Sequence, residues 1–421
     1  MKLNRILLLA LGVCVLMACK REGCTNQTAD NYDKKAKNDD GSCTFNGVNP
    51  NNPNNPNDPN DPNDPNDPNQ TLPIRLTGTE TSNRTITNIA SNPGVIEYYI
   101  DGSWNIDAAV TIEPGVRIEM RPGAAIIIQS NGSLDATGTA SNKINIMGTQ
   151  DVAGYWEYIR FNSNNLNNKL IHCNISNGSG AWNVPGMITV SGNGQLKMQN
   201  STITKGDEFG LYLDNINSKL PDFNSNFFDH FTKSPLVLKS FAQAIHLNNS
   251  TTFGGNNVIN RIFINGTNYS TSLSVPKMQI PYFINETFEI TGGHTGIESG
   301  VEMIMGANRI ITVGSSASLA FNGTSGQRNT VRGDQPTQGF WESIIIESNN
   351  TNNVFSYTDF SDGGGPWNAP ATIYLRGRLE MNNCSISNGL EAAIDGNGSA
   401  VLVDGGGITY FNNAGGDNLL P

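Results

Sequence analysis

Two stretches of this chain repeat the same pattern of residues at a fixed distance. The segments that begin at Trp156 and Trp341 both contain Trp-Glu, then an apolar run, then a Ser-Asn-Asn turn. The offset is 341 − 156 = 185 residues, and the same offset separates Trp182 from Trp367 in a second shared motif, Trp-Asn-x-Pro. The chain therefore contains an internal duplication of a block that holds several secondary-structure elements.

The elements in this block are predicted to be short β-strands. Beyond Leu72 the sequence alternates short runs of apolar residues with turns rich in Asn, Gly and Ser, and no amphipathic helical window of useful length interrupts them. Such runs suit a β-sandwich, a propeller or a β-solenoid. A propeller repeats at roughly 40 to 50 residues, whereas a solenoid can duplicate any whole number of coils. The offset therefore favours a solenoid.

The amino-acid sequences of individual strands support this prediction. The segments IEPGVRIEM, SLDATGT, GYWEYIRF, LIHCNIS and NSTI resemble right-handed parallel β-helix proteins of the pectate-lyase-like superfamily, and the resemblance extends from Val95 to the C-terminus. It implies an all-β, right-handed parallel β-helix of roughly 13 to 16 coils, at about 20 to 25 residues per coil. Because many activities share this architecture, the resemblance indicates the fold and not the function.

The N-terminus carries an export signal. Lys2 and Arg5 precede an apolar run that is too short to span a membrane, which is typical of a signal peptide. Leu16 to Cys19 resembles a bacterial lipobox, and this resemblance implies that Cys19 is lipidated and becomes the mature N-terminus. Lys20 and Arg21 favour anchoring at the outer membrane. Whether the protein would face the cell surface or the periplasm stays open.

A small segment framed by two cysteines follows. Residues Gly23 to Phe45 resemble short thrombospondin type 3-like segments of secreted bacterial proteins. In an exported chain, a disulfide between Cys24 and Cys43 is expected. The nearby carboxylates could bind Ca²⁺, although the positive charge of three neighbouring lysines disfavours a bound cation. The alternative is an Asx-rich turn without metal. The candidate ligands are Asp30, Asp33, Asp39 and Asp40.

The remaining boundaries follow from composition. Repeats of Asn-Pro-Asn and Asp-Pro-Asn predict an extended, disordered spacer of about 65 Å. We expect a signal peptide (1–18), a lipidated N-terminus with the cysteine-framed segment (19–47), a linker (48–72) and the β-helix (73–421), whose first repeat covers about 95–204, non-repeated coils about 205–279 and second repeat about 280–399.

Charge restricts the partners. The formal charge is −11 and becomes −11 − 2 = −13 once the signal, with its two basic residues, is removed. This balance argues against nucleic acid or an anionic lipid surface as partner. Contact with the membrane is expected through the N-terminal lipid alone.

Candidate catalytic residues lie only in the non-repeated coils. A lyase would need a Lys or Arg base beside a neutralising charge, and a hydrolase would need paired carboxylates. No catalytic motif surrounds the available groups, and a solvated loop explains them as well. The candidates are Lys205, Asp207, Glu208, Asp229, His230 and Lys233.

Two tryptophans are candidate ligand contacts. Trp182 and Trp367 follow Gly-rich runs, and an exposed indole there could stack on a sugar ring. The alternative is that each indole covers the end of a hydrophobic stripe. His172, His246 and His294 are scattered along the sequence and do not predict a zinc site.

Several other residues are expected to be structural. Asn174, Asn200 and Asn383 are predicted at turns where their side chains continue the backbone ladder, and Cys173 and Cys384 are predicted to be inward-facing free thiols.

Three functions remain open from the sequence. The first is a lipid-anchored β-helix that binds a glycan or another surface ligand without catalysis, or acts as an adhesin. The second is a polysaccharide lyase or glycoside hydrolase, and the third is a structural envelope protein. Convergent carboxylates in a groove would favour the enzyme, whereas flat faces with exposed aromatic residues would favour binding.

Overall fold

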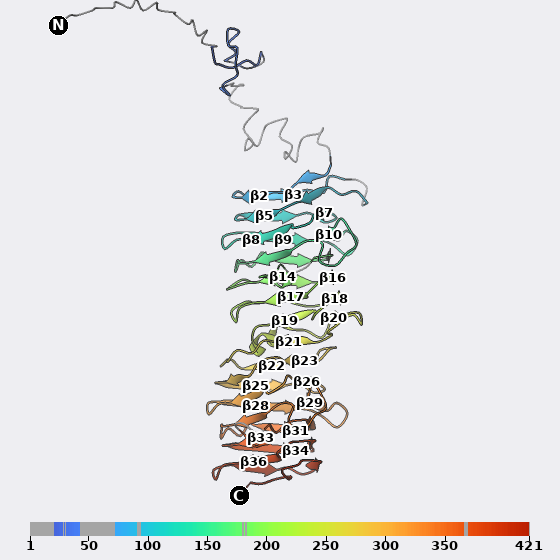
Figure 1. Ribbon diagram of the computed structural model, residues 1–421, viewed down its shortest axis with the longest axis vertical. Coiled ribbons are helices and arrows are strands. Elements are labelled where there is room, and N and C mark those ends of the chain that lie inside the picture. The colour runs from blue at the N-terminus through green and yellow to red at the C-terminus, as the bar shows by residue number, and fades with distance from the viewer. Residues whose placement is uncertain are drawn as a thin grey trace, which may run out of the picture. The chain divides into compact units, whose positions relative to one another are not determined.

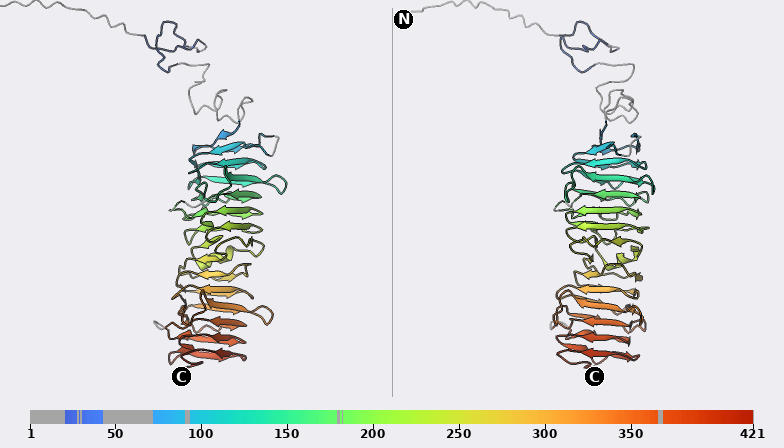
Figure 2. Two further views of the ribbon diagram at one scale, coloured as in Figure 1. Left: turned by 45° about the vertical axis from the view of Figure 1, so that its right-hand side comes forward. Right: turned by 90° about the vertical axis from the view of Figure 1, so that its right-hand side faces the viewer.

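The computed structural model describes residues 21–27, 29, 31–42, 72–90, 94–178, 181, 183–365 and 369–420. The chain divides into two compact units, residues 1–71 and residues 72–421. The second unit is a parallel β-solenoid of about 13 turns (Figure 1). Every strand pair in it is parallel, and neighbouring coils stack their strands in flat faces (Figure 2). The predicted all-β parallel β-helix is therefore confirmed.

Three sheets build the N-terminal coils of the solenoid, and one of them continues to the C-terminal end. The 8-stranded sheet holds β1 (Ile74–Arg75), β4 (Tyr98–Ile100), β7 (Arg117–Met120), β10 (Ile144–Gly148), β13 (Cys173–Ser176), β16 (Thr202–Gly206), β18 (Phe227–Phe231) and β20 (Thr252–Phe253). The first 5-stranded sheet holds β3 (Arg84–Ile86), β6 (Ala109–Ile112), β9 (Ser133–Thr137), β12 (Lys169–Ile171) and β15 (Lys197–Gln199).

The 14-stranded sheet runs along the whole solenoid. It holds β2 (Gly78–Glu80), β5 (Ser103–Ile106), β8 (Ala125–Ile128), β11 (Tyr158–Phe161), β14 (Gly186–Val190), β17 (Phe209–Leu213), β19 (Leu236–Leu238), β21 (Ile262–Ile264), β23 (Tyr282–Ile284), β26 (Glu302–Met305), β29 (Asn329–Gly333), β32 (Thr358–Ser361), β35 (Ser385–Ser387) and β38 (Thr409–Phe411).

Two further sheets complete the C-terminal coils. The 6-stranded sheet holds β22 (Leu273–Val275), β25 (Gly293–Ile297), β28 (Ala317–Asn322), β31 (Val354–Ser356), β34 (Arg378–Asn382) and β37 (Val401–Asp404). The second 5-stranded sheet holds β24 (Phe288–Ile290), β27 (Ile310–Val313), β30 (Ser343–Ile346), β33 (Ala371–Leu375) and β36 (Ala392–Gly396).

Alternation of side chains along each strand fills the interior. In β7, for example, Ile118 and Met120 are fully buried while Arg117 and Glu119 are only partly covered. Because successive side chains in a strand point to opposite faces, each coil places its alternate Ile, Val, Leu and Phe residues over those of the next coil. One continuous core runs from Ile74 to Ile394.

The two copies of the duplicated block are out of phase around the solenoid. Strands β11 and β30 are equivalent by the 185-residue offset, yet β11 lies in the 14-stranded sheet and β30 in the second 5-stranded sheet. Likewise β10 belongs to the 8-stranded sheet, whereas its equivalent β29 belongs to the 14-stranded sheet. Equivalent strands of the two copies therefore lie in different sheets.

This change of phase occurs in the non-repeated coils. The 8-stranded sheet, which holds the first strand of each N-terminal coil, ends at β20. Strand β21 is the second strand of the coil that begins with β20. It pairs with β23, which is the first strand of the next coil. The only helix in the described part of the chain, the 3-10 helix η1 (Phe241–His246), also lies here. No helix of the described residues is long and apolar enough to cross a membrane. The non-repeated segment thus joins two similar stacks through a different pairing.

The tryptophans that mark the duplication are core residues. Trp156 and Trp341 are buried, and their indole nitrogens donate to the carbonyls of Ser176 and Ser361, both at 2.7 Å. Each indole occupies the same place within its own copy. Because the copies differ in phase, the two indoles precede strands of different sheets, β11 in the 14-stranded sheet and β30 in the second 5-stranded sheet.

The predicted structural asparagines and cysteines divide into two groups. Asn200 and Asn383 lie in turns with φ values of 52° and 53°, as predicted. Asn174, by contrast, lies inside β13, where it donates to the Asn145 side chain at 3.0 Å, so its assignment to a turn was wrong. Cys173 and Cys384 are buried free thiols, as predicted.

Candidate binding surface

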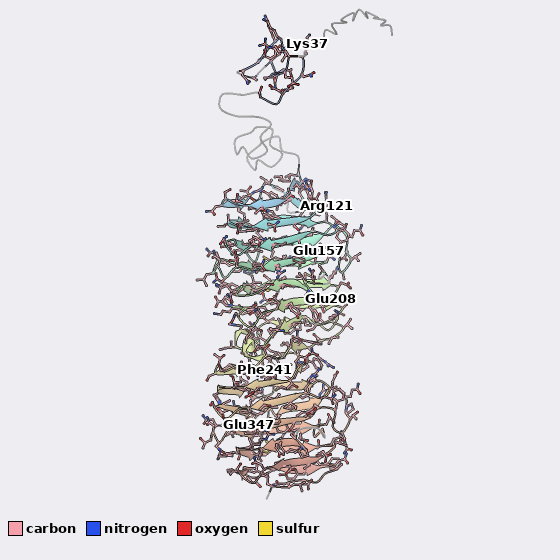
Figure 3. The ribbon with its side chains drawn as sticks, turned by 60° about the vertical axis from the view of Figure 1, so that its left-hand side comes forward. Lys37, Arg121, Glu157, Glu208, Phe241 and Glu347 are labelled. Atoms are coloured by element: carbon pink, nitrogen blue, oxygen red, sulfur yellow. The ribbon has the colours of Figure 1, made fainter. Side chains whose placement is uncertain are left out.

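The six predicted catalytic residues lie on neighbouring coils, where most of them form ion pairs, and Asp229 is the one among them that is buried. Lys205 pairs with Asp151 at 2.5 Å, and Lys233 pairs with Glu208 at 2.7 Å. The side chain of Glu208 lies on the flank of the middle coils, above Phe241 of η1 (Figure 3). Asp207 is exposed on the turn between β16 and β17. In these two contacts, the ammonium groups of Lys205 and Lys233 each neutralise one carboxylate.

Asp229 and His230 form a third pair, in which the carboxylate holds the backbone in place. His230 Nδ1 lies 2.9 Å from the Asp229 carboxylate, which also accepts from the backbone and side-chain amides of Asn256 at 3.0 and 2.9 Å. Burial alone would raise the pKa of Asp229, but these hydrogen bonds and the neighbouring imidazole outweigh it and lower the pKa. The ionised carboxylate of Asp229 therefore stabilises the turn around Gly254. It lies so close to this glycine that a Cβ at position 254 would clash with it.

The backbone explains why Lys205 and His230 appear together. Ser176, Thr204 and Asp229 are register partners on successive coils, so the next residues, Asn177, Lys205 and His230, stack in one column. All three have positive φ values, 69°, 60° and 60°. Asn177 directly follows β13, whereas Lys205 and His230 are the second-last residues of β16 and β18. The column is a backbone bend repeated near the end of each strand, which explains it without a convergence of functional groups.

A row of aromatic side chains on the outer face of the 14-stranded sheet was missed by the sequence analysis. Phe209, Tyr212, Phe263 and Phe283 come from β17, β21 and β23. Phe209 lies 5.7 Å from Tyr212 and 6.2 Å from Phe263, and Phe263 lies 4.8 Å from Phe283, between ring centroids. Phe209, Tyr212 and Phe263 are partly exposed. We call these four residues the aromatic row.

Charged side chains flank the aromatic row and neutralise one another. Lys233, paired with Glu208, lies 5.3 Å from the centroid of Phe209. At the other end, the guanidinium of Arg261 lies 5.1 Å from the centroid of Phe283 and pairs with Asp334 at 2.6 Å. Two predicted residues, Glu208 and Lys233, are therefore part of this surface. Its flanking pairs carry no net charge.

One sequence signal could have revealed the aromatic row. In both β21 and β23, three apolar residues follow one another, with Phe263 between two isoleucines and Phe283 between Tyr282 and Ile284. In a half-buried strand, the central residue of such a triplet must point outward. The adjacency of β21 and β23, however, depends on the change of phase and is not visible in the sequence.

Several predicted residues lie outside the described residues. These are Cys19, Cys43, Asp30, Trp182 and Trp367, so the lipidation, the disulfide and the two tryptophan contacts remain predictions. Cys24 is buried with 1% of its surface exposed.

The other three carboxylates of the cysteine-framed segment contact nearby chain. Asp33 accepts from the Lys35 amide at 2.9 Å and pairs with Arg21, while Asp39 and Asp40 accept from the amides of Gly41 and Ser42. The hydrogen bond from the Lys35 amide makes the largest contribution to lowering the pKa of Asp33. The hydrogen bonds from Ser42 lower the pKa of Asp40 in the same way. Among the described residues, no cluster of three or more His, Cys, Asp or Glu side chains could hold a metal ion. Calcium binding by this segment stays a prediction.

The outer surface of the solenoid includes two hollows that described residues line. One, of about 430 Å³, is lined by the polar side chains Asn164, Asn193, Gln195, Asn217 and Lys219. The other is an open groove of about 680 Å³ beside η1 and the 6-stranded sheet. Its lining includes a single carboxylate, that of Glu298, so it does not offer the paired carboxylates of a hydrolase.

No family model matches this chain, and no curated protein or solved structure matches it significantly. The structure shows the parallel β-solenoid, and membership of the pectate-lyase-like superfamily stays a prediction.

Proposed function

We propose that this protein is a lipid-anchored surface protein that binds a neutral glycan without chemically changing it. The observation that carries the proposal is the aromatic row, an apolar strip on a flat sheet face. Sugar rings present one face of C–H groups, and packing that face against an aromatic ring removes apolar surface from water. Rings along this strip could contact successive residues of an extended chain.

Charge supports a neutral ligand. Lys233 and Arg261 at the ends of the row are paired with Glu208 and Asp334, so neither offers an unpaired cation to a carboxylate or sulfate group. The full chain also carries a formal charge of −11, which repels polyanions at long range. Both features favour uncharged polysaccharides.

The arrangement of titratable groups supports binding over catalysis. Lys205, Glu208 and Lys233 each sit in an ion pair within hydrogen-bond distance, and Asp229 lies within that distance of His230 Nδ1. General acid and base catalysis needs two groups placed on either side of a reacting bond. The flanking pairs instead border the aromatic row and can hydrogen-bond to sugar hydroxyls.

The test combines binding and product analysis. The full chain is applied to an array of neutral and acidic polysaccharides, and the same ligands are incubated with it and examined for new reducing ends and unsaturated products. We expect binding to neutral glycans, at least about tenfold weaker after Phe263→Ser, and no products. Phe411→Ser is a matched control, because Phe411 is also an outward aromatic, 75% exposed on the last strand. Release of oligosaccharides, or unchanged binding by Phe263→Ser, would contradict the proposal.

A further inference from the structure

The groove beside η1 has the features of a second, separate binding site. It lies over the 6-stranded sheet and does not include any residue of the aromatic row. The apolar part of its lining comes from Ile245, Leu247, Leu273 and Pro276. Ile245 lies in η1 and has 54% of its surface exposed. Its exposure leaves an apolar wall open to solvent.

Polar groups held by hydrogen bonds also line the groove. His294 Nδ1 lies 2.9 Å from Ser318 Oγ, which orients the ring. Glu298 accepts from Ser274 Oγ at 3.2 Å and from the Lys277 amide at 3.3 Å, which orients the carboxylate. These contacts leave His294 Nε2 without a hydrogen-bond partner among the described residues. The polar side of the groove is therefore organised before any ligand arrives.

Gly296 forms the floor between these groups and keeps it open. A Cβ at this position would lie 3.3 Å from Asn322 Nδ2 and 3.6 Å from His294 Nε2, so two polar nitrogens converge on the space that the glycine leaves. The backbone of Gly296 does not need positive φ. The glycine is therefore explained by the open space of the groove and not by the backbone conformation of a turn.

From this geometry we infer that the groove binds a single neutral sugar residue, such as the end or a short branch of a glycan. Its volume of about 680 Å³ falls within the range of sites for small ligands. The apolar wall suits the C–H face of a sugar ring, and the imidazole, amide and carboxylate suit its hydroxyl groups. Glu298 repels an anionic ligand. This inference goes beyond the proposed function, because it concerns different residues on another sheet.

The test uses four simple probes, methyl glycosides of glucose, galactose, mannose and N-acetylglucosamine, titrated against the full chain and followed by saturation-transfer NMR. At least one is expected to bind. Gly296→Ala should weaken that binding at least about tenfold by filling the hollow, and Asn322→Ala should weaken it by a similar factor. Gly326→Ala is the matched control, since a Cβ at Gly326 meets nothing within 4 Å.

Three outcomes would overturn the inference. They are failure of all four sugars to bind, unchanged binding in both Gly296→Ala and Asn322→Ala, and glucuronic acid binding as tightly as glucose. Phe263→Ser should leave the sugar titration unchanged, so failure here and failure of the aromatic row as a glycan surface can be told apart.

Discussion

Gly363 lies against the indole of Trp341 so closely that a Cβ at this glycine would stand 2.8 Å from the ring. The same relationship recurs in the first copy, where a Cβ at Gly178 would stand 2.7 Å from the ring of Trp156. The offset of 185 residues is thus preserved in a contact and not only in the sequence. Each indole is held along the edge that carries Nε1, by this contact at its Cζ2 and Cε2 atoms and by its hydrogen bond to Ser176 or Ser361.

We expect Gly363→Ala to destabilise the solenoid by about 1 to 3 kcal/mol, because the added methyl group must displace the indole or Thr372 in a filled core. Urea denaturation followed by tryptophan fluorescence would measure the change. Gly326→Ala, in open space, should stay within about 0.5 kcal/mol of the unaltered chain. A Gly363→Ala protein as stable as this control would mean that the indole is not held where we describe it.

A second prediction concerns the buried thiols. Burial raises the pKa of Cys173 to about 12, and burial likewise raises the pKa of Cys384. Since the thiolate is the reactive form, iodoacetamide at pH 8 should alkylate neither cysteine in the folded chain and both after unfolding. Mass-spectrometric peptide mapping gives the readout. Rapid alkylation of Cys173 under native conditions would contradict its place in the core.

The same shift predicts a loss of stability at alkaline pH. The ordinary pKa of the Cys173 thiol is 9.0, so the unfolded chain ionises before the folded one does. Its contribution is fully present below pH 9 and is lost as the pH rises towards about 12. Between pH 9 and 11, the Tm of the unaltered chain should therefore fall more steeply than that of Cys173→Ser. Parallel pH profiles for the two proteins would refute this link.

A fourth prediction concerns the N-terminal end of the solenoid. Glu80 accepts from Arg84 Nη1 at 2.6 Å and from the indole nitrogen of Trp104 at 2.9 Å, so this ion pair covers the first buried indole. Glu80→Ala leaves both donors unpaired and should cost about 2 kcal/mol. In a solenoid the loss is local, so hydrogen exchange should quicken in β1 to β6 and stay unchanged near the C-terminus.

The matched control for this experiment is Glu119→Ala. Glu119 pairs with Arg121, whose side chain is 40% exposed, and such surface pairs contribute little. Equal exchange in the Glu80→Ala and Glu119→Ala proteins would show that the polar pair does not protect the end.

The sequence predicts the repeated parts of this fold well. The duplication and the alternation of apolar residues lead to a parallel β-solenoid, because both patterns are local or repeat at a fixed offset. Asn200 and Asn383 were placed in turns correctly for the same reason. Asn174 was misplaced because an Asn ladder inside a strand has the same sequence appearance as one at a turn.

The candidate surface could be predicted only in part. Glu208 and Lys233 were identified as charged residues of the non-repeated coils, but the aromatic row beside them was not. Its formation requires β21 to pair with β23, a pairing that the duplication itself argues against, since equivalent strands would normally stack. Phe263 and Phe283 meet because of this long-range register, which no local pattern in the sequence specifies.

The claim that β21 and β23 are neighbours therefore supports the rest of the account, and engineered disulfides test it directly. Phe263 and Phe283 are register partners, so Phe263→Cys with Phe283→Cys should crosslink readily under mild oxidation, because parallel neighbours lie within disulfide reach. If the two copies stacked in phase, β21 would lie beside β24, and Phe263→Cys would crosslink with Glu289→Cys instead. We predict the first crosslink without the second; the second without the first would contradict the account.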